Sequence, residues 1–137
     1  MKVYWKTISV ETSRDHEYVD VTSELEQFVQ ESSVQHGLLN VFCPHTTAAV
    51  VVQEDDFSMH QDTEDALKRL FPLDIAYRHN MEGNLNATAH IKNQLVGPEV
   101  TLPVREGKLL LGTWQRVFFL ELCEARSRRL ELTLIGE

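Results

Sequence analysis

The stretch from Leu38 to Gln53, LLNVFCPHTTAAVVVQ, contains two runs of strand-forming residues on either side of a short polar turn. Branched and aromatic side chains dominate both runs, 38–43 and 48–53, and such residues favour β-strands. The second run, AAVVVQ, lacks apolar–polar alternation, which is typical of a strand that is buried on both faces. Because Pro44, His45, Thr46 and Thr47 separate the runs, we expect His45 at a strand junction.

Towards the N-terminus, two further strands and a helix are predicted. Val3–Val10 alternates as a strand does, and Tyr18–Val21 is its expected hairpin partner across the polar residues 13–17. A helix then begins with Thr22 or Ser23 as its cap and is ended by Gly37. Its apolar face, which we expect to cover the sheet, comprises Leu25, Phe28 and Val29.

Two helices and a loop are predicted after the central strands. The first helix is capped by Asp55 or Asp56 and reaches Phe71, where Pro72 stops it. Its expected inward residues are Ala66, Leu67, Leu70 and Phe71. Residues 72–86 show no period and form a loop, after which Asn86 caps a helix over 87–96 that Gly97 closes.

Four more strands complete the prediction. They are Glu99–Val104, Lys108–Leu111, Gln115–Cys123 and Arg128–Ile135, the last with Leu130, Leu132 and Leu134 on one face. No linker or repeat divides the chain. The sequence therefore predicts an α+β fold in one domain, residues 1–137, with mainly antiparallel β-sheet of about eight strands and two to three helices packed on it.

Charge and apolar patterning exclude several classes of protein. The 137 residues include 13 basic and 21 acidic ones, and the net charge of -8 argues against a nucleic-acid partner. The segment MKVYWKTISVE has no apolar core of a signal peptide, and no apolar run is long enough to span a membrane, so we expect a cytoplasmic protein. Cys43 and Cys123 lie in apolar runs without CxxC spacing and are interpreted as reduced, buried thiols, with a disulfide as the alternative.

The segment from His79 to His90, HNMEGNLNATAH, concentrates groups that bind metals or move protons. Together with His45 it supplies three imidazoles, the number of protein ligands in a typical catalytic zinc site. Glu82 is a candidate acid or base, or a group that orients a ligand imidazole. The alternatives are a loop histidine held by local hydrogen bonds, a histidine on the polar face of a helix and a solvated carboxylate. The remaining histidines, His16, His36 and His60, are assigned to the surface.

Two other groups of residues are candidates for ligand binding. In the turn at 112–115, GTWQ, Trp114 could stack on a heteroaromatic ring and Gln115 could read a ring edge, although Trp114 is equally compatible with the core. The basic residues Arg126, Arg128 and Arg129 suit phosphate or carboxylate. The alternative for these arginines is an exposed turn, or ion pairs with Glu121, Glu124 and Glu131.

Several of these motifs occur in an order that resembles the YjbQ family, also called the secondary thiamine-phosphate synthase family. The matching pieces, which span nearly the whole chain, are HTTA at 45–48, HNMEGN at 79–84, AH at 89–90, GTWQ at 112–115, and finally Arg126 and Arg128. One departure is Asn80, which stands where many members look to have aspartate.

The resemblance implies a homotrimer that joins hydroxymethylpyrimidine pyrophosphate to a thiazole phosphate, releasing pyrophosphate. It implies a pocket in which His45, His79, Glu82 and His90 are catalytic, and in which the three histidines hold a divalent metal. Histidine ligands favour zinc, and pyrophosphate chemistry keeps magnesium as a second candidate. Contacts to the phosphorylated small molecule are expected from Thr46, Asn84, Thr113, Trp114, Gln115, Arg126 and Arg128. The alternative is a noncatalytic trimer that binds a metal or small ligand.

Overall fold

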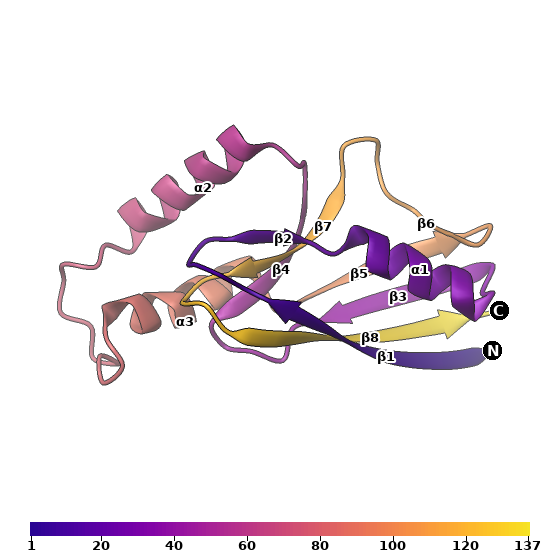
Figure 1. The fold of residues 1–137 in the computed structure, drawn as a ribbon, viewed down its shortest axis with the longest axis horizontal. Coiled ribbons are helices and arrows are strands. Elements are labelled where there is room, and N and C mark those ends of the chain that lie inside the picture. Colours follow the sequence, from indigo (N-terminus) through magenta and orange to yellow (C-terminus); the bar gives the residue numbers. More distant parts are fainter.

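Two antiparallel sheets and three helices make up the protein in a computed structural model that describes residues 1–137 (Figure 1). The five-stranded sheet has the order β1 (Lys2–Glu11), β8 (Ser127–Gly136), β3 (His36–Phe42), β5 (Glu99–Arg105) and β6 (Lys108–Leu109). The three-stranded sheet has the order β2 (Tyr18–Asp20), β7 (Arg116–Glu121) and β4 (Ala48–Gln53). The predicted α+β class with mainly antiparallel sheet is confirmed.

The core lies on the inner face of the five-stranded sheet. Alternation along β8 places Leu130, Leu132 and Leu134 inward, each at most 1% exposed, as predicted. Helix α1 (Thr22–Ser32) covers this face and buries the predicted residues Leu25, Phe28 and Val29 in the same apolar cluster. Burial of these side chains stabilises the layer arrangement, because each fully buried leucine or phenylalanine contributes roughly 1.5–3 kcal/mol.

The predicted hairpin between the first two strands is wrong. All ten residues of β1 pair with β8, whereas β2 pairs with β7 in the other sheet. The intervening segment crosses between the sheets and is tied to the second one: the Thr12 hydroxyl donates to the Glu121 carboxylate at 2.7 Å, and the His16 amide donates to the Glu121 carbonyl. Alternation identifies a strand but contains no information about which distant strand will pair with it.

The ends of the first helix also differ from the prediction. Thr22 is its first residue and caps nothing; its hydroxyl oxygen accepts the amide of Val117 on β7 at 2.8 Å. The helix ends at Ser32, and Gly37 lies in β3 instead. A Cβ on Gly37 would lie 2.1 Å from the carbonyl oxygen of Ile135. Glycine is required there by the close approach of β3 and β8.

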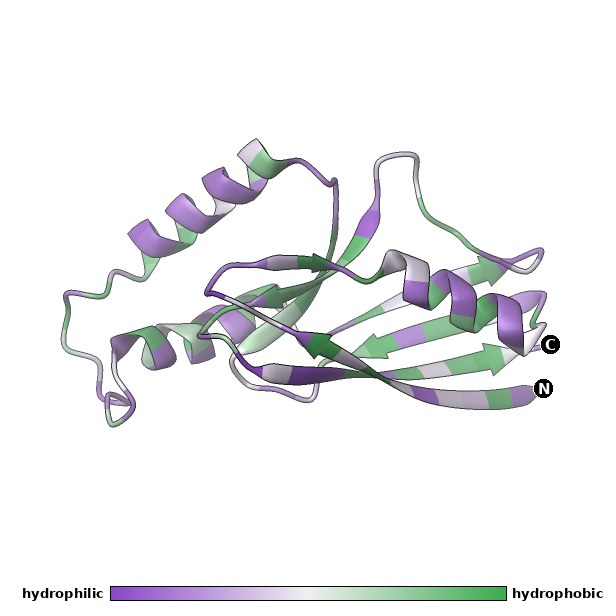
Figure 2. Ribbon diagram, viewed as in Figure 1, coloured by the Kyte–Doolittle hydropathy of each residue, from purple (hydrophilic) through white to green (hydrophobic).

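Helix α2 (Phe57–Leu70) begins with the predicted cap, since the Asp56 carboxylate accepts the amide of Met59 at 3.1 Å. The prediction that Leu70 faces inward is wrong: it is 67% exposed, Phe57 is 68% exposed, and no residue of this helix is buried. The helix contacts the three-stranded sheet through His60, whose ring stacks on Tyr18 of β2 at 3.8 Å, and Figure 2 shows the helix in largely hydrophilic colours. None of the three helices is long and apolar enough to cross a membrane.

Helix α3 (Asn84–Val96) packs against β4 and carries His90, as predicted. It begins two residues before the predicted cap Asn86, with Gly83 preceding it at a φ of 91° and with Gly97 ending it. A positive φ of this kind favours glycine. The loop that was predicted over 72–86 therefore ends at Gly83.

Both cysteines are buried, and neither forms a disulfide. Burial raises the pKa of the Cys43 thiol to about 11, so the thiol is protonated at neutral pH. The interpretation as reduced, buried thiols is confirmed.

The assignment of His16 to the surface is wrong, because His16 is only 2% exposed. Its Nδ1 lies 2.8 Å from the Asp15 carboxylate, and its Nε2 lies 2.9 Å from Nζ of Lys92, which is 1% exposed. Polar neighbours in the sequence suggested solvent, but these groups satisfy one another inside the protein. Of the other two histidines, His36 is exposed and His60 is half-buried.

We expect His16 to make the protein less stable in mild acid. Burial lowers the pKa of His16 below its usual 6.5, even though Asp15 opposes the shift. The unfolded chain therefore binds this proton more readily than the folded chain, and stability is lost as the pH falls below 6.5 and through the folded pKa. The slope reaches at most about 1.4 kcal/mol per pH unit.

Urea denaturation of His16→Gln between pH 5 and 7.5 measures this contribution. The variant should have a flatter pH profile than the wild type, and His36→Gln should keep the wild-type slope. Some slope will persist, because burial also lowers the pKa of His45. Equal slopes in His16→Gln and the wild type would contradict the assignment.

Candidate functional site

A polar cavity of about 290 Å³ lies where the β3–β4 turn, the start of α3 and the beginning of β8 meet. Its lining comprises Pro44, His45, Thr46, Thr47, Glu82, Asn86, His90, Arg126 and Arg128. We call it the first cavity. It contains six of the predicted site residues, drawn from three segments that are far apart in the sequence.

His45 occupies the predicted junction between β3 and β4 and is held by the backbone of β8. The Arg129 amide donates to its Nε2 at 3.1 Å, and the Arg129 carbonyl lies 3.2 Å from the same nitrogen. Burial, followed by the Arg128 guanidinium, lowers the pKa of this imidazole. The ring is therefore neutral at pH 7 and fixed in orientation, and its Nδ1 makes no hydrogen bond within the chain.

His90 forms a wall between the first cavity and a second one of about 380 Å³. The exposed His79 lines only the second cavity, with its ring at 87° to that of His90 and the ring centroids 4.8 Å apart. His45 lines only the first. The structure thus brings His79 to His90 and His45 to His90, but does not direct all three into one cavity.

The ligand nitrogens of His45, His79 and His90 do not converge on one point in this structure. Zinc holds imidazole nitrogens at about 2.0–2.1 Å, which requires its ligand atoms to converge. The only three metal-ligating side chains whose ligand atoms all lie within 4.8 Å of one another are Asp15, His16 and Glu64. The Nζ of Lys68 already pairs with this cluster, at 2.6 Å from the Glu64 carboxylate and 3.7 Å from the Asp15 carboxylate.

The arginines near the first cavity are held in ion pairs. These pairs, which were the alternative expected from the sequence, join Arg128 to Glu121, Arg126 to Glu124 and Arg129 to Glu131. Arg128 is buried and binds Glu121 with both Nε and Nη2, while Nη2 also donates to the Thr47 hydroxyl at 3.0 Å. Arg128 is thus committed to the protein, whereas the more exposed Arg126 remains accessible at the first cavity.

The GTWQ turn and Asn84 lie outside both cavities. Trp114 is 71% exposed on the loop between β6 and β7, so it does not belong to the core either. Thr113 and Gln115 are also exposed, and the Gln115 side chain accepts the amide of Gly112. Asn84 donates to two backbone carbonyls of the loop before α3, which positions that loop.

Asn86 is a site residue that the sequence did not reveal. It is 5% exposed and lines the first cavity, yet its Oδ1 is buried without a hydrogen-bond partner. An unsatisfied buried polar group costs about 1–3 kcal/mol, so its retention calls for an explanation such as a ligand. The only signal was its place near His90, and that place equally suggested a helix cap.

Comparisons with known proteins identify the same family over nearly the whole chain. The family described as UPF0047 protein YjbQ-like matches residues 6–137. A UPF0047 protein of Methanothermobacter thermautotrophicus is 37% identical over 137 residues, which cover 100% of this chain and 95% of that protein. The protein YjbQ of Escherichia coli O157:H7 is 33% identical, covering 98% and 99% of the two chains.

The solved structures support the same grouping. A YbjQ-like protein of unknown function from Sulfolobus solfataricus has a TM-score of 0.93 and 36% identity, with 99% of each chain covered. A hypothetical protein from Aeropyrum pernix has a TM-score of 0.91 and 35% identity, with 98% and 99% of the two chains covered. The sequence match and the shared fold lead to one conclusion: the chain belongs to the UPF0047 (YjbQ-like) family.

Proposed function

We propose that this protein is a transferase that acts on a phosphorylated small heterocycle, with thiamine-phosphate synthase-like chemistry. One observation carries the proposal: His45, Glu82, His90 and Arg126, from three distant segments, line one cavity that contains no apolar side chain other than a proline. Its volume of about 290 Å³ is at the lower end of the range for ligand sites, which favours a small ligand.

The proposed reaction needs charge stabilisation more than a strong base. The ring nitrogen of the thiazole attacks the methylene carbon of the pyrimidine, a C–N bond forms, and the C–O bond breaks with its electron pair leaving on pyrophosphate. The nitrogen becomes a quaternary cation. Arg126 and His90 are the candidate donors to the departing oxygens, and Glu82 is the candidate carboxylate to stabilise developing positive charge.

Turnover of the purified full chain tests the proposal. With hydroxymethylpyrimidine pyrophosphate and thiazole phosphate as substrates, we expect pyrophosphate release that requires both substrates. Calorimetric titration with each substrate alone separates binding from chemistry. Binding without any pyrophosphate release would reject the transferase and support a noncatalytic ligand-binding protein. One observation favours that second function: no hydrogen bond joins Glu82 to His45 or His90, so no acid–base pair is preassembled.

Replacing Asn86 with leucine should stabilise the fold and weaken ligand binding. The change removes a buried oxygen that has no partner and keeps a similar volume in α3, so we expect the free energy of unfolding to rise by about 1 kcal/mol. A ligand that uses the Asn86 amide should bind more weakly. Chemical denaturation and calorimetric titration with the pyrimidine substrate measure the two effects.

Asn93→Leu is the matched control for this change. Asn93 lies on the same helix, but its Nδ2 donates to the carbonyls of His45 and Ala48 at 3.3 and 2.7 Å. The same substitution should therefore lower the free energy of unfolding there, because it removes satisfied hydrogen bonds. A destabilised Asn86→Leu variant that binds substrate normally would show that Asn86 is structural.

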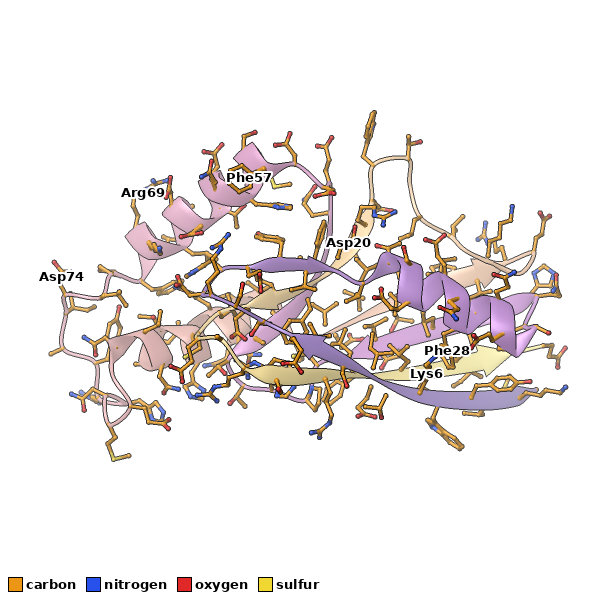
Figure 3. All side chains as sticks on the ribbon, viewed as in Figure 1. Lys6, Asp20, Phe28, Phe57, Arg69 and Asp74 are labelled. Atoms are coloured by element: carbon orange, nitrogen blue, oxygen red, sulfur yellow. The ribbon has the colours of Figure 1, made fainter.

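We also propose that the protein associates as a homotrimer. Helix α2 and the loop after it present apolar side chains that nothing in the chain covers; they are Phe57, Leu70, Leu73 and Ile75, each at least 48% exposed (Phe57 is labelled in Figure 3). Sedimentation equilibrium should give three times the chain mass of 15.8 kDa. Leu70→Asp should shift the protein towards the monomer, whereas a monomeric wild type would reject the proposal.

A further inference from the structure

The second cavity, on the other side of His90, has a lining with unusual charge for this protein. It lies between the loop before α3 and the helix itself, and its side chains include Tyr77, Arg78, His79, His90 and Gln94. No carboxylate lines it. The chain has a net charge of -8, so an arginine and two imidazoles around a cavity without acidic residues favour the binding of an anion there.

Arg78 is free to bind such an anion. Its guanidinium makes no ion pair and no hydrogen bond within the chain, in contrast to Arg126 and Arg128 beside the first cavity. An unpaired guanidinium keeps all its donors available in the planar arrangement that matches a phosphate. The arginines singled out from the sequence are thus paired with glutamates, whereas the arginine that lines the second cavity has no such partner.

The loop that carries Arg78 is anchored by the side chains of Tyr77 and Asn84. The Tyr77 hydroxyl donates to the carbonyl of Pro72 at 2.7 Å, and Asn84 donates to the carbonyls of Leu73 and Ile75 at 2.8 and 3.0 Å. The ring of His79 packs edge-to-face with that of His90. The loop backbone that precedes Arg78 is therefore tied to the start of α3, and the two imidazoles are packed together, before any ligand arrives, which reduces the entropy lost on binding.

We propose that Arg78, His79 and His90 form an oxyanion subsite that binds the phosphate group of a phosphorylated ligand. Because His90 also lines the first cavity, the two cavities give one bipartite site, with the anion on the Arg78 side and the remainder of a ligand on the Asn86 side. The subsite extends the proposed function, but anion binding does not require turnover.

Calorimetric titration with inorganic phosphate and with pyrophosphate, at constant pH and ionic strength, tests the subsite in the full chain. We expect both anions to bind the wild type and Arg78→Gln to weaken binding about tenfold or more. Arg69→Gln is the matched control, because Arg69 is also exposed and unpaired but projects from α2 (Figure 3). It should bind both anions as the wild type does.

Three outcomes would overturn the subsite: no binding of either anion by the wild type at millimolar concentration, equal affinities in Arg78→Gln and Arg69→Gln, or loss of binding in Arg126→Gln alone. The proposed transferase fails separately. If anion binding depends on Arg78 but no turnover occurs, the subsite is supported and the transferase is rejected. If turnover occurs and Arg78→Gln has unchanged anion affinity, only the subsite is rejected.

Discussion

Replacing Arg128 with alanine is expected to lower the free energy of unfolding by about 3–5 kcal/mol. Its side chain is 3% exposed, and its partner Glu121 is completely buried, with Nε and Nη2 bound to the two carboxylate oxygens. The carboxylate also accepts from Thr12 and from the amide of Cys123. Without the guanidinium, a buried negative charge is left unpaired, which is far more costly than the loss of an average hydrogen bond.

Urea denaturation at pH 7 measures this effect, with Arg126→Ala as the matched control. Arg126 pairs with Glu124, and both side chains are exposed, so its removal should change stability by less than about 1 kcal/mol. The double variant Arg128→Met, Glu121→Gln should recover part of the loss, because it removes both charges together. Equal effects of Arg128→Ala and Arg126→Ala would mean that the buried pair has little energetic role.

The fold was predictable where one local pattern determines the structure. Strict alternation in β8 fixed its inward leucines, and helical spacing fixed the inward residues of α1. Pairing between strands was not predictable, because β1 and β2 are adjacent in sequence and yet enter different sheets. Leu70 shows a related limit: helical periodicity marks an apolar face, but it does not say whether the same chain covers it.

The candidate site, too, was predictable only in part. His45, Glu82 and His90 were identified because metal-binding or proton-transferring side chains stand out in a sequence, and the fold brings them to one cavity. Asn86 was missed because a missing hydrogen-bond partner is visible only in three dimensions. Arg128 was selected by its residue type, but a buried glutamate seven residues away claims its guanidinium. Residue type therefore predicts which side chains can bind a ligand or transfer a proton, and packing decides which of them remain available to a ligand.

The position of His90 between the two cavities gives the three histidines different expected roles. His90 lines both cavities, while His45 and His79 line one each. A substitution at His79 should therefore act mainly on affinity for the anion, and one at His45 mainly on the contents of the first cavity. Only His90 is placed to contact the bond between a phosphate on one side and a ring on the other.

His90→Ala should consequently lower kcat of the proposed transferase by at least about a hundredfold, the loss expected when one donor to developing negative charge is removed. The fold should remain stable to within about 1 kcal/mol, since His90 is half-buried on α3 and its side chain makes no hydrogen bond within the chain. Pyrophosphate release at saturating substrate gives kcat, and urea denaturation gives stability.

His36→Ala is the control for this prediction, because His36 is exposed on β3 and lines neither cavity. It should keep wild-type turnover. His79→Ala separates binding from chemistry: if His79 serves only the anion, KM should rise while kcat changes little, in contrast to His90→Ala. Retention of kcat in His90→Ala, with the fold intact, would show that leaving-group stabilisation does not depend on this imidazole, and the donor role would then fall to Arg126 at the same cavity.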